Sequence, residues 1–195
     1  MELTPRPLEG RLVRLEPFRP ELEAELRACL DCDPDAWALI SSSAHGEHFD
    51  ASWTKALRAQ AAGERLPYAI RSRADGHLVG TSSFLNLRLK DNGLEIGWTF
   101  LRPETRGTAV NPEAKLLMLA EAFGSGAMRV ELRTDLINLR SQAAIAKLGA
   151  RREGVLRKHV VTWTGRIRDT VVFSITDDEW PAVRDGLERR LAALA

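Results

Sequence analysis

The chain has 195 residues, of which 44% are apolar and 28% are charged. This length favours a single domain over residues 1–195 with a large buried core, and the apolar fraction excludes an intrinsically disordered chain. With 28 Lys and Arg against 27 Asp and Glu, the net charge of +1 produces no field that would favour nucleic acid or an anionic membrane as a partner.

The N-terminal third predicts one strand and two helices. Residues 11–16 (RLVRLE) alternate apolar and polar side chains, as an edge strand does. Leucines recur at helical spacing between residues 20 and 30, which predicts the first helix. A second helix is expected from about residue 47 to residue 62, and Gly63 ends it.

The same region carries residues that could bind metal. Cys29 and Cys32 form a C-x-x-C pair, but no second pair of ligands follows at zinc-site spacing, and the pair lies in a helix-like stretch. We therefore interpret them as two small buried thiols. His45 and His48 lie in a loop that contains Ser and Gly, and we expect them to be solvated. The sequence predicts no metal site.

Nothing in the sequence indicates export or membrane insertion. The first residues, MELTPRPLEG, have no apolar stretch of signal-peptide type. No window approaches the roughly 20 apolar residues that a membrane-spanning helix needs. We therefore expect a cytoplasmic protein that has no membrane partner.

Three strands are expected in the centre of the chain. Residues 66–73 and 78–86 predict a hairpin around the turn Ala74-Asp75-Gly76. Residues 93–101 (GLEIGWTFL) alternate with period two, which predicts a third strand. That alternation places on one face Leu94, Ile96, Trp98 and Phe100, and on the other Glu95, Gly97 and Thr99.

A loop, a helix and another strand follow. Asn111 and Pro112 suit the N-cap and the first turn of a helix that continues to Gly124. Residues 128–134 (MRVELRT) alternate again and predict a strand. Because a helix connects them, we expect strands 93–101 and 128–134 to be parallel, with a right-handed crossover.

The C-terminal part completes an α+β pattern. A short helix is expected from Asn138 to Gly149, and residues 160–164 and 167–175 predict a hairpin. Residues 176–179 have capping-box spacing at the start of a terminal helix. The order of elements predicts an α+β fold, in which a mixed sheet of about seven strands is flanked by helices on both faces.

The loop before the central helix is the best candidate for a ligand site. Small ligands gather where the C-terminal ends of strands meet the N-termini of helices. Gly107 and Ala109 are small enough for backbone N–H groups to approach an anion, and Arg106 adds a positive charge. A phosphate or pyrophosphate is the expected ligand. The motifs of triphosphate loops, dinucleotide-binding loops and hydrolase elbows are absent from the sequence.

Three segments in this order carry a family resemblance. RGTAVNPEAKLLML follows a strand that reads LEIGWTF, NLRSQAAIAKLGA follows the next strand, and REGVLRKH comes after it. With these segments, and with its order of elements over nearly the whole chain, the sequence resembles the GNAT superfamily of N-acetyltransferases. Within that superfamily it looks like the Rim-type branch of ribosomal-protein N-terminal acetyltransferases. The resemblance implies acetyl-CoA as the cofactor.

The resemblance also implies which residues bind the cofactor. The family pattern Q/R-x-x-G-x-G/A falls on residues 104–109, where Glu104 departs from it at the first place. The backbone of residues 106–110 would hold the pyrophosphate, and the strand end would pair with the pantetheine arm. An N-x-x-S motif begins at Asn138, which could cap its helix, contact pantetheine, or do both. The implied cofactor-binding residues are Phe100, Leu101, Arg102, Arg106, Gly107, Thr108, Ala109, Val110, Asn111, Asn138 and Ser141.

Amine acetylation needs a base, a proton donor and an oxyanion donor. Because an α-amino group has a pKa of ~8, a modest base is sufficient to neutralise it. Glu95, on the polar face of its strand, is our first candidate for the base, and His159 is the second. Ser141 would bring a hydroxyl near the thioester sulfur. A backbone N–H near Phe100 or Leu101 would stabilise the oxyanion.

The sequence thus predicts an acetyl-CoA-dependent N-acetyltransferase that works by direct attack in a ternary complex, with neither a covalent enzyme intermediate nor a metal. The acceptor would be a primary amine of a protein N-terminus or of a small molecule. A homodimer is compatible with the family resemblance. The alternative is a noncatalytic acyl-CoA-binding or sensory module. Glu104 favours that alternative, as does Val160, which stands where some Rim-type enzymes carry an acidic base.

Overall fold

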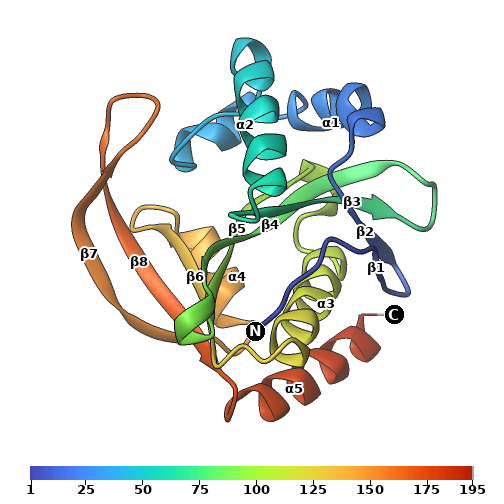
Figure 1. Cartoon of the computed structure of the whole chain (residues 1–195), viewed down its shortest axis with the longest axis vertical. Coiled ribbons are helices and arrows are strands. Elements are labelled where there is room, and N and C mark those ends of the chain that lie inside the picture. Colours follow the sequence, from blue (N-terminus) through green and yellow to red (C-terminus); the bar gives the residue numbers. More distant parts are fainter. Residues whose placement is uncertain (195) are drawn as a thin grey trace.

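The computed structural model describes residues 1–194 and contains one mixed sheet of eight strands (Figure 1). Their order in the sheet is β1-β2-β3-β4-β5-β6-β8-β7. The strands are β1 (Leu8–Glu9), β2 (Val13–Pro17), β3 (Leu66–Ser72), β4 (Leu78–Arg88), β5 (Gly93–Leu101), β6 (Arg129–Asp135), β7 (Arg151–Val161) and β8 (Ile167–Thr176). The sequence predicted about seven strands, and the additional one is the two-residue strand β1.

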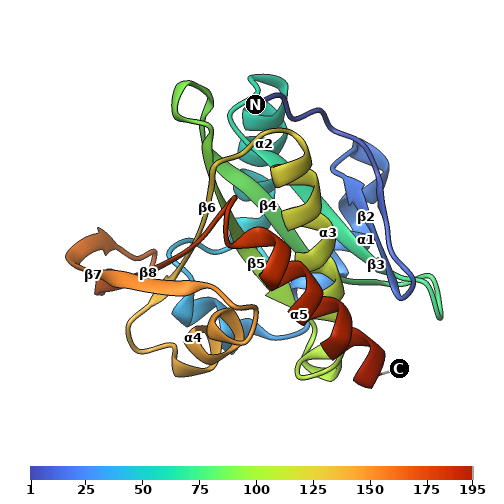
Figure 2. The same cartoon turned by 90° about the horizontal axis from the view of Figure 1, so that it is seen from below.

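Helices cover both faces of this sheet, as predicted. They are α1 (Glu23–Leu30), α2 (Phe49–Ala61), α3 (Val110–Gly124), α4 (Leu139–Ala146) and α5 (Trp180–Ala193). Helices α3 and α5 lie side by side on one face, and α1 and α2 lie on the other (Figures 1 and 2). Each face therefore has its own apolar cluster. No helix within residues 1–194 has the length and apolar character needed to cross a membrane.

Strands β5 and β6 run parallel but separate after a short paired stretch. Their register pairs Gly93 with Arg129 and ends where Glu95 meets Glu131. From Ile96 onward, β5 has no partner on this side within the described chain, although it continues to pair with β4 up to Leu101. The parallel arrangement predicted from the strand-helix-strand pattern is confirmed. The separation of the two strands leaves an unpaired edge on each.

A bulge at Trp98 changes the faces of β5. Trp98 has a φ of +52°, and two residues of β5 lie opposite the single residue Ser82 of β4 at this point. Leu94 and Ile96 therefore pack in the cluster under α3, whereas Trp98 and Phe100 pack against α1 and α2. The expectation that these four side chains share one face is wrong, because an extra residue reverses the alternation.

Two predicted element boundaries also need correction. Helix α3 begins at Val110 with Ala109 as its N-cap, so Asn111 lies in the first turn and is not the cap. The first strand of the late hairpin spans Arg151–Val161, and not residues 160–164. This strand forms one edge of the sheet and most of its residues are exposed. Its sequence therefore lacks the alternation of apolar and polar residues that predicts a half-buried strand.

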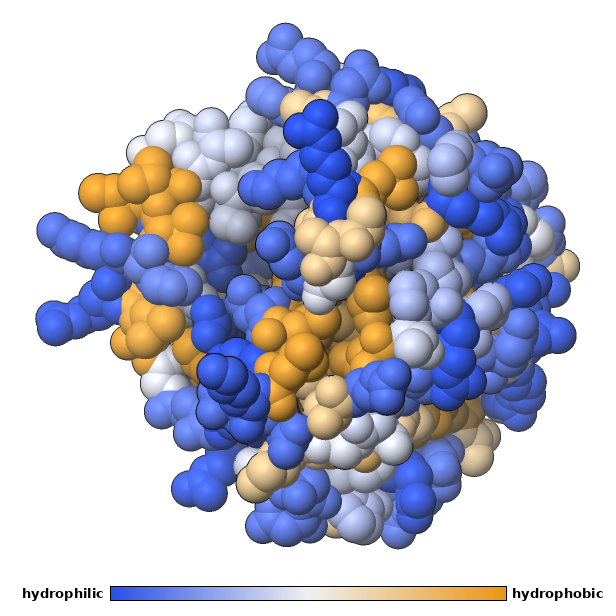
Figure 3. Space-filling view, in the orientation of Figure 1, coloured by the Kyte–Doolittle hydropathy of each residue, from blue (hydrophilic) through white to orange (hydrophobic). Residues whose placement is uncertain are grey.

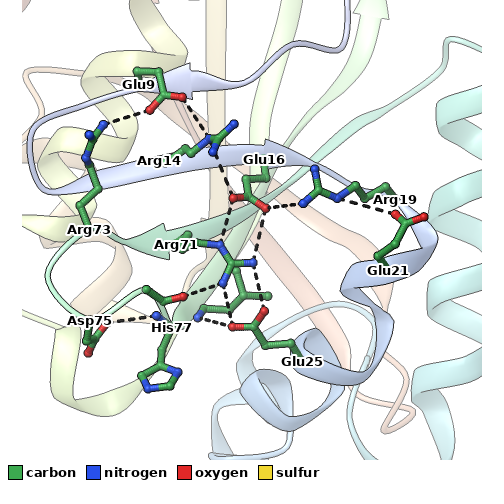
Figure 4. A network of polar contacts seen from close by, with 12 residues as sticks. Glu9, Arg14, Glu16, Arg19, Glu21, Glu25, Arg71, Arg73, Asp75 and His77 are labelled. Carbon is green, nitrogen blue, oxygen red and sulfur yellow. Dashed lines mark hydrogen bonds and ion pairs between the residues drawn. The ribbon is translucent and has the colours of Figure 1, made fainter.

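A network of ion pairs connects α1 to strands β2, β3 and β4 of the sheet (Figure 4). Glu16 of β2 is buried, and its Oε1 accepts a 2.9 Å hydrogen bond from Nε of Arg71. Nη1 of Arg71 also donates to Oε1 of Glu25 on α1, at 2.9 Å. The same Glu25 oxygen accepts from the backbone N–H of Leu78 at 3.0 Å. These charge-assisted contacts join β2, β3, β4 and α1.

The cysteines and histidines of the N-terminal region differ from expectation. Cys29 is buried, and burial raises the pKa of its thiol to about 12, but Cys32 lies beyond the end of α1 and is exposed. The rings of His45 and His48 lie 6.0 and 5.0 Å from that of Trp163, so these histidines pack on one side against that ring while both stay partly exposed to solvent. Residues 1–194 contain no group of three or more His, Cys, Asp or Glu that could hold a metal ion.

Candidate active site

A cavity of about 420 Å³ occupies the space where β5 and β6 separate. Its lining comes from both strands, from the N-terminal ends of α3 and α4, from the β7–β8 hairpin and from residues 36–41. Figure 3 shows apolar side chains exposed near the middle of the face seen in Figure 1, surrounded by hydrophilic ones. The mixed lining suits a ligand that has both an apolar arm and polar groups.

The loop that enters α3 presents unpaired backbone donors. Gly107 has a φ of +80°, and it is exposed together with Thr108. The N–H groups of Gly107, Thr108 and Ala109 have no acceptor within residues 1–194. The loop is held by its own hydrogen bonds, including one of 2.7 Å from Oγ1 of Thr108 to the carbonyl of Thr105. Successive free amides next to a helix N-terminus form a cradle for an anion.

The charged side chains of this loop are already paired. Nη1 of Arg106 lies 2.6 Å from Oδ2 of Asp33, and its Nε donates a 2.9 Å hydrogen bond to the carbonyl of Leu101. Its positive charge is thus offset, contrary to the expectation that it is available to a ligand. Glu104 pairs with Arg102. The attraction of the loop for anions therefore comes mainly from its main chain.

The end of β5 has an unpaired backbone edge beside the cavity, but only over part of residues 100–102, where the sequence predicted pairing with a ligand. Phe100 and Leu101 pair with β4 on one side and have no partner strand on the other within the described chain. The backbone of Arg102 is different, because its N–H donates to Val79 at 2.9 Å and its carbonyl accepts from Thr105 at 3.0 Å. An extended ligand could thus add to the edge of β5 up to the N–H of Leu101, because the Leu101 carbonyl already accepts from Arg106 and the main chain of Arg102 is bonded.

The start of α4 brings two polar side chains to the cavity wall. Oδ1 of Asn138 accepts a 3.0 Å hydrogen bond from the N–H of Ser141, so Asn138 is the N-cap, which is one of the two roles that the sequence left open. Its Nδ2 and the hydroxyl of Ser141 have no partner among the described residues. Both groups remain available to a ligand. Asn111, in the first turn of α3, also lines the cavity, and its buried Oδ1 has no partner in residues 1–194.

Glu95 is buried in the cavity wall, with 8% of its surface exposed. Its Oε2 accepts a 2.8 Å hydrogen bond from Asn86, and Nε of Arg133 lies 3.5 Å from the same oxygen. Burial raises the pKa of Glu95 above its ordinary value, although Arg133 and Asn86 oppose this effect. A raised pKa strengthens a carboxylate as a proton acceptor.

His159 lies at the margin of the cavity and is exposed. Lys158 beside it has a φ of +50°, at an irregularity where β7 shifts register against β8. Nδ1 of His159 is 3.1 Å from Oγ1 of Thr170. Partial burial and the positive charges of Arg133 and Arg168 lower the pKa of His159. The imidazole is thus neutral at neutral pH, but it is less enclosed than Glu95.

Lys115 of α3 is a buried cation that the sequence reasoning missed. Its side chain is 4% exposed, and Nζ donates to Oγ of Ser82 at 2.8 Å and to Oγ1 of Thr99 at 2.7 Å. It therefore connects α3 to both strands next to the Trp98 bulge. No carboxylate lies within ion-pair distance in residues 1–194, and burial lowers the pKa of Lys115 to about 7. The helical pattern of residues 111–124 does not reveal that the side chain of Lys115 is buried.

This pKa predicts a pH-dependent stability. Between the folded-state value of about 7 and the ordinary value of 10.5, the unfolded chain binds one proton more than the folded chain. The free energy of unfolding should therefore rise with pH in this window, by about 1.4 kcal/mol per unit. Relative to Lys115→Met, wild type should gain about 2–3 kcal/mol between pH 7.5 and 9.5. Urea unfolding at both pH values measures this gain, with exposed Lys55→Met as the matched control. A difference that does not change with pH would contradict the assignment.

The tip of the β7–β8 hairpin is attached to the segment that contains residues 36–41, part of which lines the cavity. Nε1 of Trp163 donates a 2.9 Å hydrogen bond to the carbonyl of Trp37, and its backbone N–H donates to Ser41 at 3.0 Å. His45 and His48 pack against the same ring. These contacts join segments that are far apart in the sequence. The hairpin and residues 36–41 thus form a wall opposite the separated strands.

Comparisons with known proteins agree with this geometry. The family model described as "Acetyltransferase (GNAT) domain" matches residues 12–151. A structure from T. thermophilus, assigned as an acetyltransferase, is 35% identical with a TM-score of 0.86, over 98% of this chain and 100% of that one. A GCN5-related N-acetyltransferase from Brucella melitensis is 29% identical with a TM-score of 0.87, over 96% of this chain and 86% of that one.

A more distant structure carries a ligand. Mycobacterium smegmatis RimJ, solved in complex with CoA-disulfide, is 22% identical with a TM-score of 0.76. The match covers 95% of this chain and 93% of that one, and at this identity it shows a shared fold. No curated protein matches the chain in sequence.

Proposed function

Because this chain belongs to the GNAT acetyltransferase family, the RimJ/RimL-like group, we propose that it transfers an acetyl group from acetyl-CoA to a primary amine by direct attack in a ternary complex. The family uses acyl-CoA. The observation that carries the proposal is the cavity between the separated strands β5 and β6, which lies beside the free amides of Gly107, Thr108 and Ala109.

The residues present fit coenzyme A. The three free amides of the loop can hold the diphosphate, aided by the N-terminal dipole of α3. The open edge of β5 and Nδ2 of Asn138 can bind the amides of the pantetheine arm. Arg106 supports this surface through the Leu101 carbonyl and Asp33. When bound, acetyl-CoA supplies an acetyl group that is activated as a thioester.

Glu95 is the proposed base. The acceptor ammonium must lose a proton before it can attack, and Oε1 or Oε2 of Glu95 takes that proton directly or through water. Burial raises the pKa of this carboxyl, which makes its ionised form a better base than that of an exposed glutamate. His159 is the second candidate, on the exposed margin.

Two further groups complete the proposed mechanism. The hydroxyl of Ser141, which has no partner in residues 1–194, donates a hydrogen bond to the leaving sulfur. The backbone N–H of Leu101, on the open edge of β5, donates to the oxygen that becomes negatively charged, whereas the N–H of Phe100 faces β4. This scheme uses no covalent intermediate and no metal.

Calorimetry and a transfer assay test the proposal. We expect saturable binding of acetyl-CoA, and thiol release that depends on an added amine from a panel of N-terminal peptides, amino acids and polyamines. Mass spectrometry should detect the acetylated amine. Absence of acetyl-CoA binding would overturn the proposal. Binding without thiol release for any amine would support the alternative, a noncatalytic acyl-CoA-binding module.

A further inference from the structure

Arg168 of β8 is a buried guanidinium without a counter-ion among the described residues. It is 8% exposed and lines the cavity, and its buried Nε has no hydrogen-bond partner. No carboxylate in residues 1–194 lies within 4.0 Å of its side-chain nitrogens. Burying an unpaired charge is costly, so such a group calls for a partner that the folded chain does not supply.

The nearby carboxylates are already engaged by other residues. Asp135 pairs with Arg166. Glu131 lies 2.8 Å from Nη2 of Arg133, and Glu95 is bonded to Asn86 and approached by Arg133 at 3.5 Å. None of these three carboxylates forms an ion pair with Arg168. Burial lowers the pKa of Arg168, as expected for a guanidinium that lacks a close anion.

The position of Arg168 connects it with the acceptor. It shares the cavity wall with Glu95 and His159, and it is near enough to Glu95 for each to shift the pKa of the other. The amides proposed to hold the diphosphate lie on a different element, the loop that enters α3. A ligand between Glu95 and Arg168 therefore meets one negative and one positive side chain.

We propose that Arg168 binds a carboxylate of the acceptor, so that the substrate class is a free amino acid or a similar small amino acid-like amine. This inference rests on the proposed function. The ammonium of such a zwitterion faces Glu95, and its carboxylate faces Arg168, with charge-assisted hydrogen bonds on both sides. In a protein, the α-carboxyl group of the N-terminal residue is part of a peptide bond, so it carries no charge that Arg168 could bind.

Matched pairs of acceptors test this inference. Free amino acids and their carboxamides differ at the group that Arg168 would bind. Because the carboxamide also has the lower amine pKa, kcat/KM is compared per neutral amine. On wild type, kcat/KM should be about 10–100-fold higher for the acid, as expected for a hydrogen bond to a charged group. Arg168→Gln should bring this ratio close to one, and Arg168→Lys should keep part of it. Arg152→Gln, which removes an exposed charge outside the cavity, should keep the full ratio.

Binding measurements separate the inference from the proposed function. Calorimetric titration of amino acids into the CoA-bound protein should detect binding that Arg168→Gln weakens, while the affinity for CoA stays within error. The melting temperature should not fall, because the substitution removes an unpaired buried charge. Equal use of acids and amides by wild type, or a preference for amides or peptides, would overturn the inference and leave the acetyltransferase intact. If no amine is acetylated, the proposed function fails, and the titration still decides whether Arg168 binds a carboxylate.

Discussion

Replacing Glu95 with glutamine should lower kcat by about 10²–10³-fold, the usual contribution of a general base. Glutamine keeps the size of the side chain and its hydrogen bond with Asn86, but it takes no proton from an ammonium group. Because Glu95 lies on the wall of the cavity and not in the diphosphate loop, the affinity for acetyl-CoA should stay unchanged.

The pH profile identifies Glu95 more specifically than the rate alone. The base must be ionised, so kcat/KM of wild type should fall as the pH drops through the raised pKa of this carboxyl. Glu95→Gln should lose this limb of the profile. Glu121→Gln, which alters another buried glutamate that lies outside the cavity, should keep it. Normal turnover in Glu95→Gln, or an unchanged acidic limb, would transfer the role to His159 or to water.

Replacing Gly107 with alanine should weaken binding of acetyl-CoA by about 10–100-fold. A Cβ at this position meets no atom within 4 Å, so the effect would not arise from a clash. Instead, a φ of +80° costs an L-residue roughly 1–2 kcal/mol, and relaxation of the loop turns the free amides away from the diphosphate.

Gly76 provides a matched control for this substitution. It has a φ of +76°, its Cβ would also meet nothing within 4 Å, and it lies between β3 and β4, outside the cavity. Gly76→Ala therefore carries a similar strain and should leave the calorimetric dissociation constant of acetyl-CoA unchanged. Equal affinities of the two variants would show that the conformation of residue 107 does not matter for cofactor binding.

The strand-helix-strand unit was predictable because its signals are local. Period-two alternation placed β5 at residues 93–101, as observed. The position of Asn138 before an apolar helical pattern made an N-cap one of its two expected roles, and the structure shows that cap. The capping box expected at residues 176–179 is present only in part. Glu179 accepts a 3.0 Å hydrogen bond from the N–H of Thr176, but α5 begins at Trp180 with Glu179 as its N-cap and has no side-chain cap hydrogen bond. Short-range periodicity and capping chemistry determine these features.

Other features depend on contacts that no local pattern encodes. The bulge at Trp98 leaves the alternation of apolar and polar residues in the sequence intact, but it moves the apolar side chains that follow it to the opposite face of the sheet. The pairing of Arg106 with Asp33 and the contact between Trp163 and Trp37 join distant segments. Arg168 was not predicted for the same reason, since a lone arginine in a strand reveals neither its burial nor the absence of a counter-ion in the described chain.

A crystal structure of the chain with coenzyme A bound is the most direct test of the central claim. We expect the diphosphate within hydrogen-bond distance of the N–H groups of Gly107, Thr108 and Ala109. The pantetheine arm should lie along the open edge of β5, with its sulfur near Ser141. If the diphosphate binds elsewhere, or if β5 and β6 pair with each other beyond Glu95 and Glu131, the claim is wrong.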